Sequence, residues 1–318
     1  MATAIPPLKE SEKIEFGNIQ SDEQPNRGVN NNAPTIVVAS YNIRYAVGQF
    51  LISSGLLRKA GLSGLLRGAR RSQRVAENIR NAARTFSEGR LLPVVDVLAL
   101  QEADKKTQRA GGHHVARELA EALQMSWIHV PAGIPRGEKP KTRQWWLDFE
   151  EQIGLYDTGD TGVGLLSRLP LSDVTRIDLP WQECAWRPRL AMAATVAVGA
   201  NKLRIFNAHV DPHAAVGGQL EQLEALVGAA ANANGPTLIL GDFNTLSKTK
   251  VDEMRKFLES HGYATPFPTS TPTWRGAGIR LHADWIFYRG VKISKWGVAR
   301  PLNVSDHWPI WAEVDPGN

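Results

Sequence analysis

Four apolar runs of strand length in this chain each end in a cluster of polar and charged residues. This pattern constrains the fold more than any other feature. The clusters occupy residues 40–44, 100–102, 207–211 and 241–244. A sheet whose strands end in this way delivers reactive groups to one rim, although any single cluster would be unremarkable. Two further acidic sites, Asp284 and the run Ser305-Asp306-His307, lie beside the last predicted strands.

Strand and helix patterns are interleaved from Thr35 onward. Hydrophobic patterning predicts strands at 35–39, 93–100, 127–130, 162–167, 171–178, 189–198, 202–209, 236–242, 283–288 and 307–314. Apolar residues at helical intervals predict helices at 70–86, 115–123, 219–231 and 250–260. Several strands follow one another closely enough to form antiparallel hairpins, so we expect two sheets packed on each other with helices outside.

The length of 318 residues suits one large domain or two modest ones. A content of 42% hydrophobic and 22% charged residues excludes disorder throughout. The longest apolar runs, such as residues 190–198, reach about half of the ~20 residues of a membrane-spanning helix. No secretory signal pattern is present at the N-terminus, so a cytoplasmic location is expected. Residues 1–33 are rich in turn formers and are predicted to be a mobile tail.

Positive charge is concentrated in one segment. Residues 49–90 contain nine Lys or Arg and two Glu. Such a segment suggests an anionic partner, for which nucleic acid, lipid headgroups and a phosphorylated small molecule are candidates, or simply the solvated face of a helix. Leucines between residues 51 and 66 allow peripheral membrane contact, but glycines interrupt the pattern and support it only weakly. No protein partner can be deduced.

In this order the polar clusters resemble the endonuclease/exonuclease/phosphatase superfamily, the deoxyribonuclease-like phosphoesterases. The resemblance extends from Thr35 to Val314 and rests on the motifs Tyr41-Asn42-Ile43-Arg44, Gln101-Glu102, Gly241-Asp242-Phe243-Asn244, Ala283-Asp284-Trp285-Ile286 and Ser305-Asp306-His307. Asn207-Ala208-His209 fits less tightly, because many members carry Thr before the His. The resemblance implies a four-layer α/β/β/α sandwich of two mixed, mainly antiparallel sheets flanked by helices. It also implies a single catalytic domain over residues 34–318.

Phosphoester hydrolysis requires a divalent cation, a base that orients water, and donors for the phosphoryl oxygens. Glu102 is the strongest candidate metal ligand, since hard oxygen donors suit Mg²⁺, with Mn²⁺ as an alternative. The resemblance implies that Asn42 and Asp306 complete or orient the ligand set. Asp242 is the candidate base, and Asn244 would orient the water or a phosphoryl oxygen.

Two histidines are the candidate donors. Asp284 is expected to hold His307 as an imidazolium, because a carboxylate favours the charged ring. His209 would be a second donor across the scissile phosphate. In the alternative interpretation, these side chains only hydrogen-bond to loop backbones.

Three further residues are predicted to bind substrate. Arg187 and Arg189 could clamp a phosphate or a carboxylate with their planar guanidinium groups, or pair with Glu183. Asp211 follows His209 closely and could extend the site, or serve only in the turn after it.

The sequence therefore predicts a divalent-metal-dependent phosphoester hydrolase. A phosphodiesterase or nuclease acting on nucleic acid is favoured by the basic segment. A phosphatase or phospholipase-type hydrolase of a phosphorylated lipid or small molecule is the first alternative. A non-catalytic binding module that retains the fold is the second.

Overall fold

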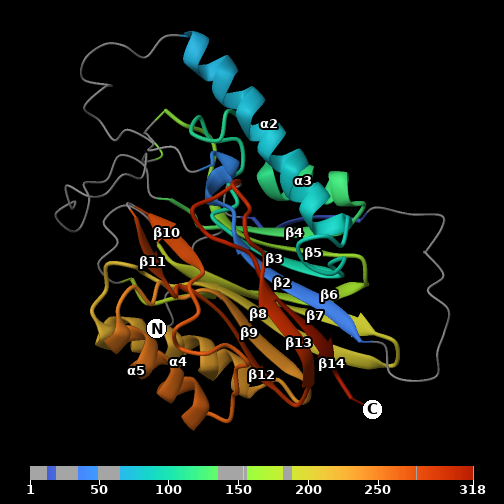
Figure 1. Cartoon of the computed structure of the whole chain (residues 1–318), viewed down its shortest axis with the longest axis vertical. Coiled ribbons are helices and arrows are strands. Elements are labelled where there is room, and N and C mark those ends of the chain that lie inside the picture. Colours follow the sequence, from blue (N-terminus) through green and yellow to red (C-terminus); the bar gives the residue numbers. More distant parts are fainter. Residues whose placement is uncertain are drawn as a thin grey trace, which may run out of the picture.

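The computed structural model describes residues 13–18, 35–48, 65–134, 153, 156–181, 188–276 and 278–317. Two large sheets lie between two pairs of helices (Figure 1). In spatial order the seven-stranded sheet contains β1 (Glu15–Gly17), β4 (Ser126–Pro131), β5 (Gly162–Ser167), β3 (Val97–Gln101), β2 (Ile36–Asn42), β14 (Ile310–Asp315) and β13 (Lys292–Val298). The five-stranded sheet contains β12 (Asp284–Arg289), β9 (Thr237–Asp242), β8 (Asn201–His209), β7 (Leu190–Val198) and β6 (Leu171–Asp178).

The remaining elements flank or connect the sheets. Helices α2 (Leu65–Ser87) and α3 (Val115–Leu123) cover the outer face of the seven-stranded sheet (Figure 1). Helices α4 (Val216–Ala231) and α5 (Lys248–Ser260) cover the five-stranded sheet. A short ribbon pairs β10 (Trp274–Gly276) with β11 (Ile279–Leu281), and the 3-10 turn η2 (Arg44–Ala46) follows β2.

Alternation along the central strands creates the layers. In β2, Ile36 and Val38 belong to the core between the sheets, whereas Val37 and Ala39 pack toward α2 and α3. This is the two-residue period of a pleated strand that is buried on both faces. The predicted fold class, an α/β fold of two packed sheets flanked by helices, is confirmed.

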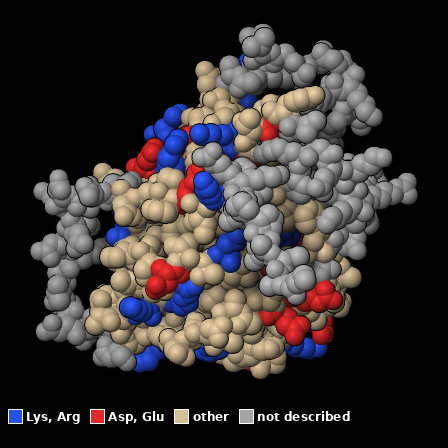
Figure 2. All heavy atoms as spheres, turned by 180° about the vertical axis from the view of Figure 1, so that it is seen from behind, with Lys and Arg blue, Asp and Glu red and all other residues tan. Residues whose placement is uncertain are grey.

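Helix α2 begins at Leu65, earlier than its predicted start at Arg70. Val75, Ile79 and Phe86 form its buried stripe, while its intervening arginines are exposed. Basic side chains also gather in the upper part of the molecule seen from behind (Figure 2). No helix among the described residues is long and apolar enough to cross a membrane.

Strand register brings the predicted polar clusters to one rim. The parallel pair β2 and β3 sets Asn42 opposite Gln101. The parallel pair β8 and β9 sets His209 opposite Asp242, and the antiparallel strand β12 sets Asp284 opposite Asp242 on its other side. Residues distant in sequence therefore share one row at the edge of each sheet.

Buried amides tie the two sheets together behind this rim. Asn207 on β8 donates from Nδ2 to the carbonyls of Leu100 and Gly164, each at 2.9 Å, which belong to the opposite sheet. Gln101 Nε2 donates to Asn207 Oδ1 at 2.6 Å and to Ser40 Oγ at 3.1 Å. Because buried polar groups must be paired, these bonds fix the lateral position of one sheet on the other.

Several elements were not predicted from the sequence. They are β1, η2, β13 and the ribbon of β10 and β11. The segment predicted as a tail is described only at residues 13–18, where β1 pairs with β4 at the sheet edge. Most of the leucine-rich segment 51–66, like residues 135–152, lies outside the described residues. The division into tail and single domain stays a prediction.

Gly241 offers a test of the rim backbone. Its φ is +138°, and an added Cβ would lie 2.0 Å from the carbonyl oxygen of Ala208 on the neighbouring strand. We expect Gly241→Ala to lower the free energy of unfolding by about 2–4 kcal/mol, measured by urea denaturation. Gly228→Ala, at an exposed position of helix α4 where no atom would lie within 4 Å of the added Cβ, should raise the free energy of unfolding by about 0.5–1 kcal/mol. Equal effects of the two substitutions would contradict the interpretation that the rim backbone has no room for a side chain at position 241.

Candidate functional site

A hydrogen bond between the two sheets lies at the centre of the rim. Asn42 at the end of β2 donates from Nδ2 to Asp242 Oδ2 at 2.8 Å. The backbone N–H of Asn244 donates to the other oxygen, Oδ1, at 2.9 Å. Both Asn42 and Asp242 are buried. The Asp242 carboxylate is thereby held in one orientation.

Two imidazoles face the same oxygen of Asp242. His209 Nε2 lies 3.5 Å and His307 Nε2 lies 3.7 Å from Asp242 Oδ2. On its other side His307 donates from Nδ1 to Asp284 Oδ2 at 2.8 Å. The result is a chain of carboxylate, imidazole, carboxylate and imidazole at the end of the five-stranded sheet.

Burial and neighbouring charges shift both pKa values in this chain. Burial alone would lower the pKa of His307, but the carboxylates of Asp284 and Asp242 raise it to about 10. Burial raises the pKa of Asp242, and the charge of Asp284 raises it further, against the lowering effect of His307 and Asn42. His307 is therefore an imidazolium at neutral pH, and Asp242 is a stronger base than an exposed carboxylate.

Glu102 lies on a strained loop directly after β3. Its φ is +52°, and Arg44, Tyr45 and Ala46 in η2 also have positive φ values of 45°, 55° and 58°. Such left-handed residues cost about 1–3 kcal/mol each and persist where the surroundings enforce them. The N–H of Tyr45 donates to the carbonyl of Glu102 at 3.0 Å, so each loop restrains the other. Glu102 Oε1 lies 3.8 Å from His209 Nε2.

Asp306 lies in the loop before β14 and is oriented from two sides. Trp274 Nε1 donates to its Oδ2 at 3.1 Å, and Arg44 Nε lies 3.7 Å from the same oxygen. Ser305 Oγ donates to the carbonyl of Asn42 at 2.7 Å. This bond attaches the Asp306 loop to the end of β2.

The donor chemistry of the rim suits a hard divalent cation. Glu102 and Asp306 supply carboxylates and Asn42 supplies an amide oxygen, which are ligand types that Mg²⁺ and Mn²⁺ prefer. Within the described residues, ligand atoms of Asp242, Asp284 and His307 lie within 4.8 Å of one another. Asp284 Oδ1 is buried and has no hydrogen-bond partner among the described residues.

Arg189 places a buried guanidinium beside His209. Its Nη1 lies 2.7 Å from His209 Nε2 and 3.1 Å from Nδ1, and only 3% of the residue is exposed. Its Nε has no hydrogen-bond partner among the described residues. A small open pocket is lined here by Ala132, Thr161, Gly162, Pro188, Arg189, Leu190 and His209. A positive group is therefore available at the pocket for an anion.

The structure brings most of the predicted site residues to this rim. It joins Asn42, Asn244, His209, His307 and Asp284 to Asp242 directly or through one neighbour, as described above. Glu102 contacts His209, and the Asp306 loop is bonded to the end of β2. The roles of these residues stay predictions.

Two predicted substrate-binding residues, Asp211 and Arg187, are not connected to Asp242 by the hydrogen bonds and ion pairs described above. Asp211 is buried in the loop after β8, where its Oδ1 accepts the N–H of His213 and its own N–H donates to Gln222. Its role in substrate binding stays a prediction. Arg187 lies outside the described residues.

Sequence reasoning assigned no site role to three residues inside the motifs. Gln101 and Asn207 join the sheets, and Ser305 fastens the Asp306 loop. The only sequence signal of Gln101 and Asn207 was a polar side chain at or near the end of an apolar strand. Ser305 was marked only by its place in the motif Ser305-Asp306-His307. Nothing in the local pattern indicated which side-chain or backbone group each would reach.

Comparison with known proteins gives one family. A model of the Endonuclease/Exonuclease/phosphatase family matches residues 39–307. An endonuclease/exonuclease/phosphatase from Bacteroides vulgatus has 14% identity and a TM-score of 0.58, with 89% of this chain and 99% of that chain covered.

Two similar solved structures are described by activity. ANGEL2, a 2',3'-cyclic phosphatase in complex with adenosine-2',3'-vanadate, has 15% identity and a TM-score of 0.54, over 88% of this chain and 95% of that one. The mannosyl-6-phosphatase Bt3783 of Bacteroides thetaiotaomicron VPI-5482 has 15% identity and a TM-score of 0.51, over 88% and 99%. Likeness at these identities shows the fold.

Asp284→Asn tests the electrostatics of the rim. The substitution removes the charge beside His307 Nδ1 but keeps an accepting oxygen, so the pKa of His307 should fall from about 10 toward its ordinary value of 6.5 or below. In the unmodified protein, the stability contributed by charged His307 is complete below pH 6.5 and is lost as pH rises to about 10. The measurement is NMR titration of the labelled ring.

Asp178→Asn is the matched control, because Asp178 is exposed and pairs with Arg176 on β6. It should leave the pKa of His307 unchanged. A titration of His307 near pH 6.5 in the unmodified protein would contradict the assigned pairing.

Proposed function

Because this chain belongs to the endonuclease/exonuclease/phosphatase family, we propose that it is a divalent-metal-dependent phosphoester hydrolase whose preferred substrate is nucleic acid. One observation carries the catalytic part of the proposal. A buried carboxylate, Asp242, lies between His209 and His307 at the rim where two sheets meet. This arrangement sets a base beside the charged donor His307 and beside His209 with its neighbour Arg189, and hydrolysis of a phosphoester requires a base and donors.

The proposed roles follow from charge and hydrogen bonding. Asp242 accepts the proton of the attacking water, for which its raised pKa makes it a better base. His307, charged through Asp284, donates to a phosphoryl oxygen, and His209 with Arg189 contacts the phosphate from the pocket side. Asn244, bonded through its N–H to Asp242, orients the water or the phosphoryl group.

Glu102, Asn42 and Asp306 are the proposed metal ligands. Bound Mg²⁺ supplies Lewis-acid neutralisation of charge that develops on the phosphoryl oxygens, and Mn²⁺ suits the same oxygen donors. Trp274 and Arg44 hold the Asp306 carboxylate in position. The strained loop conformation holds Glu102 at the rim.

A group of three arginines around Trp308 supports a polyanionic substrate. The guanidinium carbons of Arg275, Arg280 and Arg300 lie 5.0, 5.8 and 4.7 Å from the centre of its ring. The backbone N–H of Arg275 donates to the carbonyl of Asp306 at 2.9 Å, so this group of arginines lies beside the rim loop that carries Asp306. Arg275 and Arg280 are also direct partners across the β10 and β11 ribbon.

Like charges opposite one another on a ribbon repel. Burial lowers the pKa of Arg300, and the charge of Arg280 lowers it further. An anion with several phosphates would offset this repulsion at more than one arginine. Such contacts are typical of nucleic-acid backbones and exceed what a single phosphomonoester offers.

A small-molecule phosphatase is the second candidate. It is favoured by the two solved structures of this fold that are described as a 2',3'-cyclic phosphatase and a mannosyl-6-phosphatase. A lipid substrate rests on leucines that mostly lie outside the described residues, so it has less support. A non-catalytic module is disfavoured, because every chemically demanding position carries a competent side chain.

The catalytic roles are tested with Glu102→Gln and Asp242→Asn. Each should lower kcat for bis-p-nitrophenyl phosphate in Mg²⁺ by about 10³-fold, with folding verified by circular dichroism. EDTA should abolish activity, and added Mg²⁺ should restore it. Asp178→Asn is the control. Full activity in either site variant, or in EDTA, would overturn the proposal.

Substrate preference is tested with Arg280→Gln and Arg300→Gln. Each should raise KM for single-stranded DNA or RNA by about tenfold and reduce its salt dependence, because phosphate contacts are lost. Neither should change kinetics on bis-p-nitrophenyl phosphate. Arg255→Gln on α5, which removes an exposed pair with Glu259, is the control.

Equal losses on large and small substrates would contradict the role of the arginines. Hydrolysis of mannose 6-phosphate or a 2',3'-cyclic nucleotide, without hydrolysis of polynucleotides, would favour the second candidate.

A further inference from the structure

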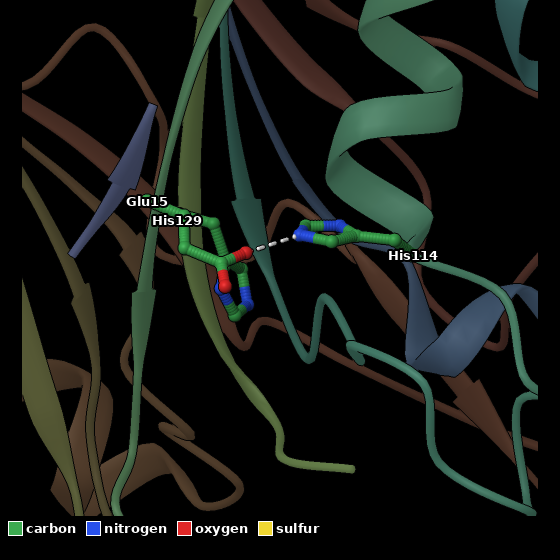
Figure 3. A group of neighbouring side chains, drawn as sticks. All are labelled: Glu15, His114 and His129. Atoms are coloured by element: carbon green, nitrogen blue, oxygen red, sulfur yellow. Dashed lines mark hydrogen bonds and ion pairs between the residues drawn. The ribbon is translucent and has the colours of Figure 1, made fainter. Parts of the chain in front are cut away.

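A second cluster of side chains with metal-ligand atoms close together shares no residue with the rim. It consists of Glu15, His114 and His129, called the Glu15 cluster below, and their ligand atoms lie within 4.8 Å of one another. Figure 3 shows the Glu15 carboxylate against the His129 ring and directed at the His114 ring. Glu15 and His129 are direct partners across β1 and β4, and His114 is the N-cap residue of α3.

His129 has a nitrogen available for a ligand. Its Nε2 lies 2.8 Å from the carbonyl oxygen of Ala103, and since a carbonyl only accepts, Nε2 carries the hydrogen. The other nitrogen, Nδ1, then has a lone pair, is buried, and has no hydrogen-bond partner among the described residues. Histidines that bind metals usually donate their second N–H to a carboxylate, a backbone carbonyl or water, and His129 has such a partner in Ala103.

His114 directs its second nitrogen at the carboxylate. Its Nδ1 accepts the N–H of Arg117 at 3.3 Å, which leaves the ring hydrogen on Nε2. That nitrogen lies 2.9 Å from Glu15 Oε2. The hydrogen on His114 Nε2 therefore lies between this nitrogen and Glu15 Oε2.

The protonation states suit metal binding. Burial lowers the pKa of His114, and it lowers the pKa of His129 to about 3. Burial would raise the pKa of Glu15, but hydrogen bonds from Lys105 and His114 bring it below its ordinary value. At neutral pH the cluster therefore consists of two neutral imidazoles and an ionised carboxylate, the forms that bind metals.

We propose that Glu15, His114 and His129 form a binding site for a divalent transition-metal ion of the Zn²⁺ class. Two imidazoles and a carboxylate are a ligand set for zinc and its neighbours, whereas Mg²⁺ prefers oxygen donors. The ion replaces the proton between His114 and Glu15. The ring hydrogen of His114 then moves to Nδ1 and the long contact with Arg117 is given up. Because the Glu15 side chain is 34% exposed, water can reach a fourth coordination position.

Bound metal would fasten a weakly held strand to the domain. Strand β1 has three residues, and Phe16 at its centre is 74% exposed, so burial holds it poorly. The ion would join β1 to β4 and α3. Through the bond from His129 to Ala103, it would also restrain the residue directly after Glu102.

Lys105 distinguishes a metal site from a simpler alternative, an ionic cluster that binds no metal. Its ammonium contacts Glu15 Oε1, and the cluster could be only an ionic latch in which Lys105 and His114 hold the carboxylate. The two roles predict opposite effects of removing the Lys105 ammonium. Removing the ammonium removes a competing cation from a metal site, but it removes an attractive partner from a latch.

The test is Zn²⁺ titration by calorimetry, with metal content measured after dialysis. The parent is the full chain carrying Glu102→Gln and Asp242→Asn, so that a charged ligand is missing from each group of rim side chains that could hold a second zinc ion. The parent should bind one Zn²⁺ per chain and bind Mg²⁺ far more weakly. Glu15→Gln and His114→Gln should each weaken Zn²⁺ binding at least tenfold, and Lys105→Met should strengthen it. Because Glu15 is partly exposed, its substitution should leave the protein folded even if His129 variants do not fold.

Glu121→Gln, on the exposed face of α3, is the matched control and should leave affinity unchanged. Zn²⁺ should raise Tm of the parent and of the Lys105→Met variant, but not of the Glu15→Gln variant. Equal Zn²⁺ affinity in the parent and the Glu15→Gln variant would overturn the proposal. Weaker or unchanged affinity after Lys105→Met would also overturn it and assign the cluster as a latch. These readouts do not depend on hydrolysis, so the proposed function stands or fails separately.

Discussion

The candidate site depends on the hydrogen bond that Asn42 donates to Asp242, because these residues end strands of different sheets. Neither sheet alone contains the whole set of candidate residues. The bond, with the buried contact between Gln101 and Asn207, sets how far one sheet can slide on the other. Loss of either would leave a buried polar group unpaired, at a cost of about 1–3 kcal/mol.

Charges at the rim are arranged so that each buried group depends on its neighbour. The Asp284 carboxylate keeps His307 charged, and charged His307 in turn makes it easier for Asp242 to be ionised. An ionised buried carboxylate without such partners would be costly. Strain in the loops of Glu102 and η2 adds to this cost. Such a rim is difficult to explain as a purely structural feature and is typical of a site that binds charge.

Much of this architecture could be predicted from the sequence, for an identifiable physical reason. Core strands such as β8 and β9 are apolar runs that end at a polar residue, so both their type and their ends can be read locally. The motifs at those ends also carried the family resemblance, which supplied the layer order. Strand β13 escaped prediction because most of its side chains are exposed and it lacks an apolar run. Strand β1 has three residues and depends on β4.

Contacts between distant segments could not be predicted. Ser305 bonds to the carbonyl of Asn42, and Trp274 orients Asp306, yet no local pattern specifies either partner. The arginines around Trp308 and the Glu15 cluster also arise only when separate strands and loops meet. The central claim, that the polar side chains gathered at this rim hold a divalent metal ion, is tested most directly by anomalous diffraction from crystals soaked in Mn²⁺. We expect one Mn²⁺ peak about 2.1 Å from a Glu102 oxygen, with Asp306 and Asn42 around it. A crystal structure in which Mn²⁺ binds elsewhere, or leaves Glu102 without a metal contact, would contradict the claim.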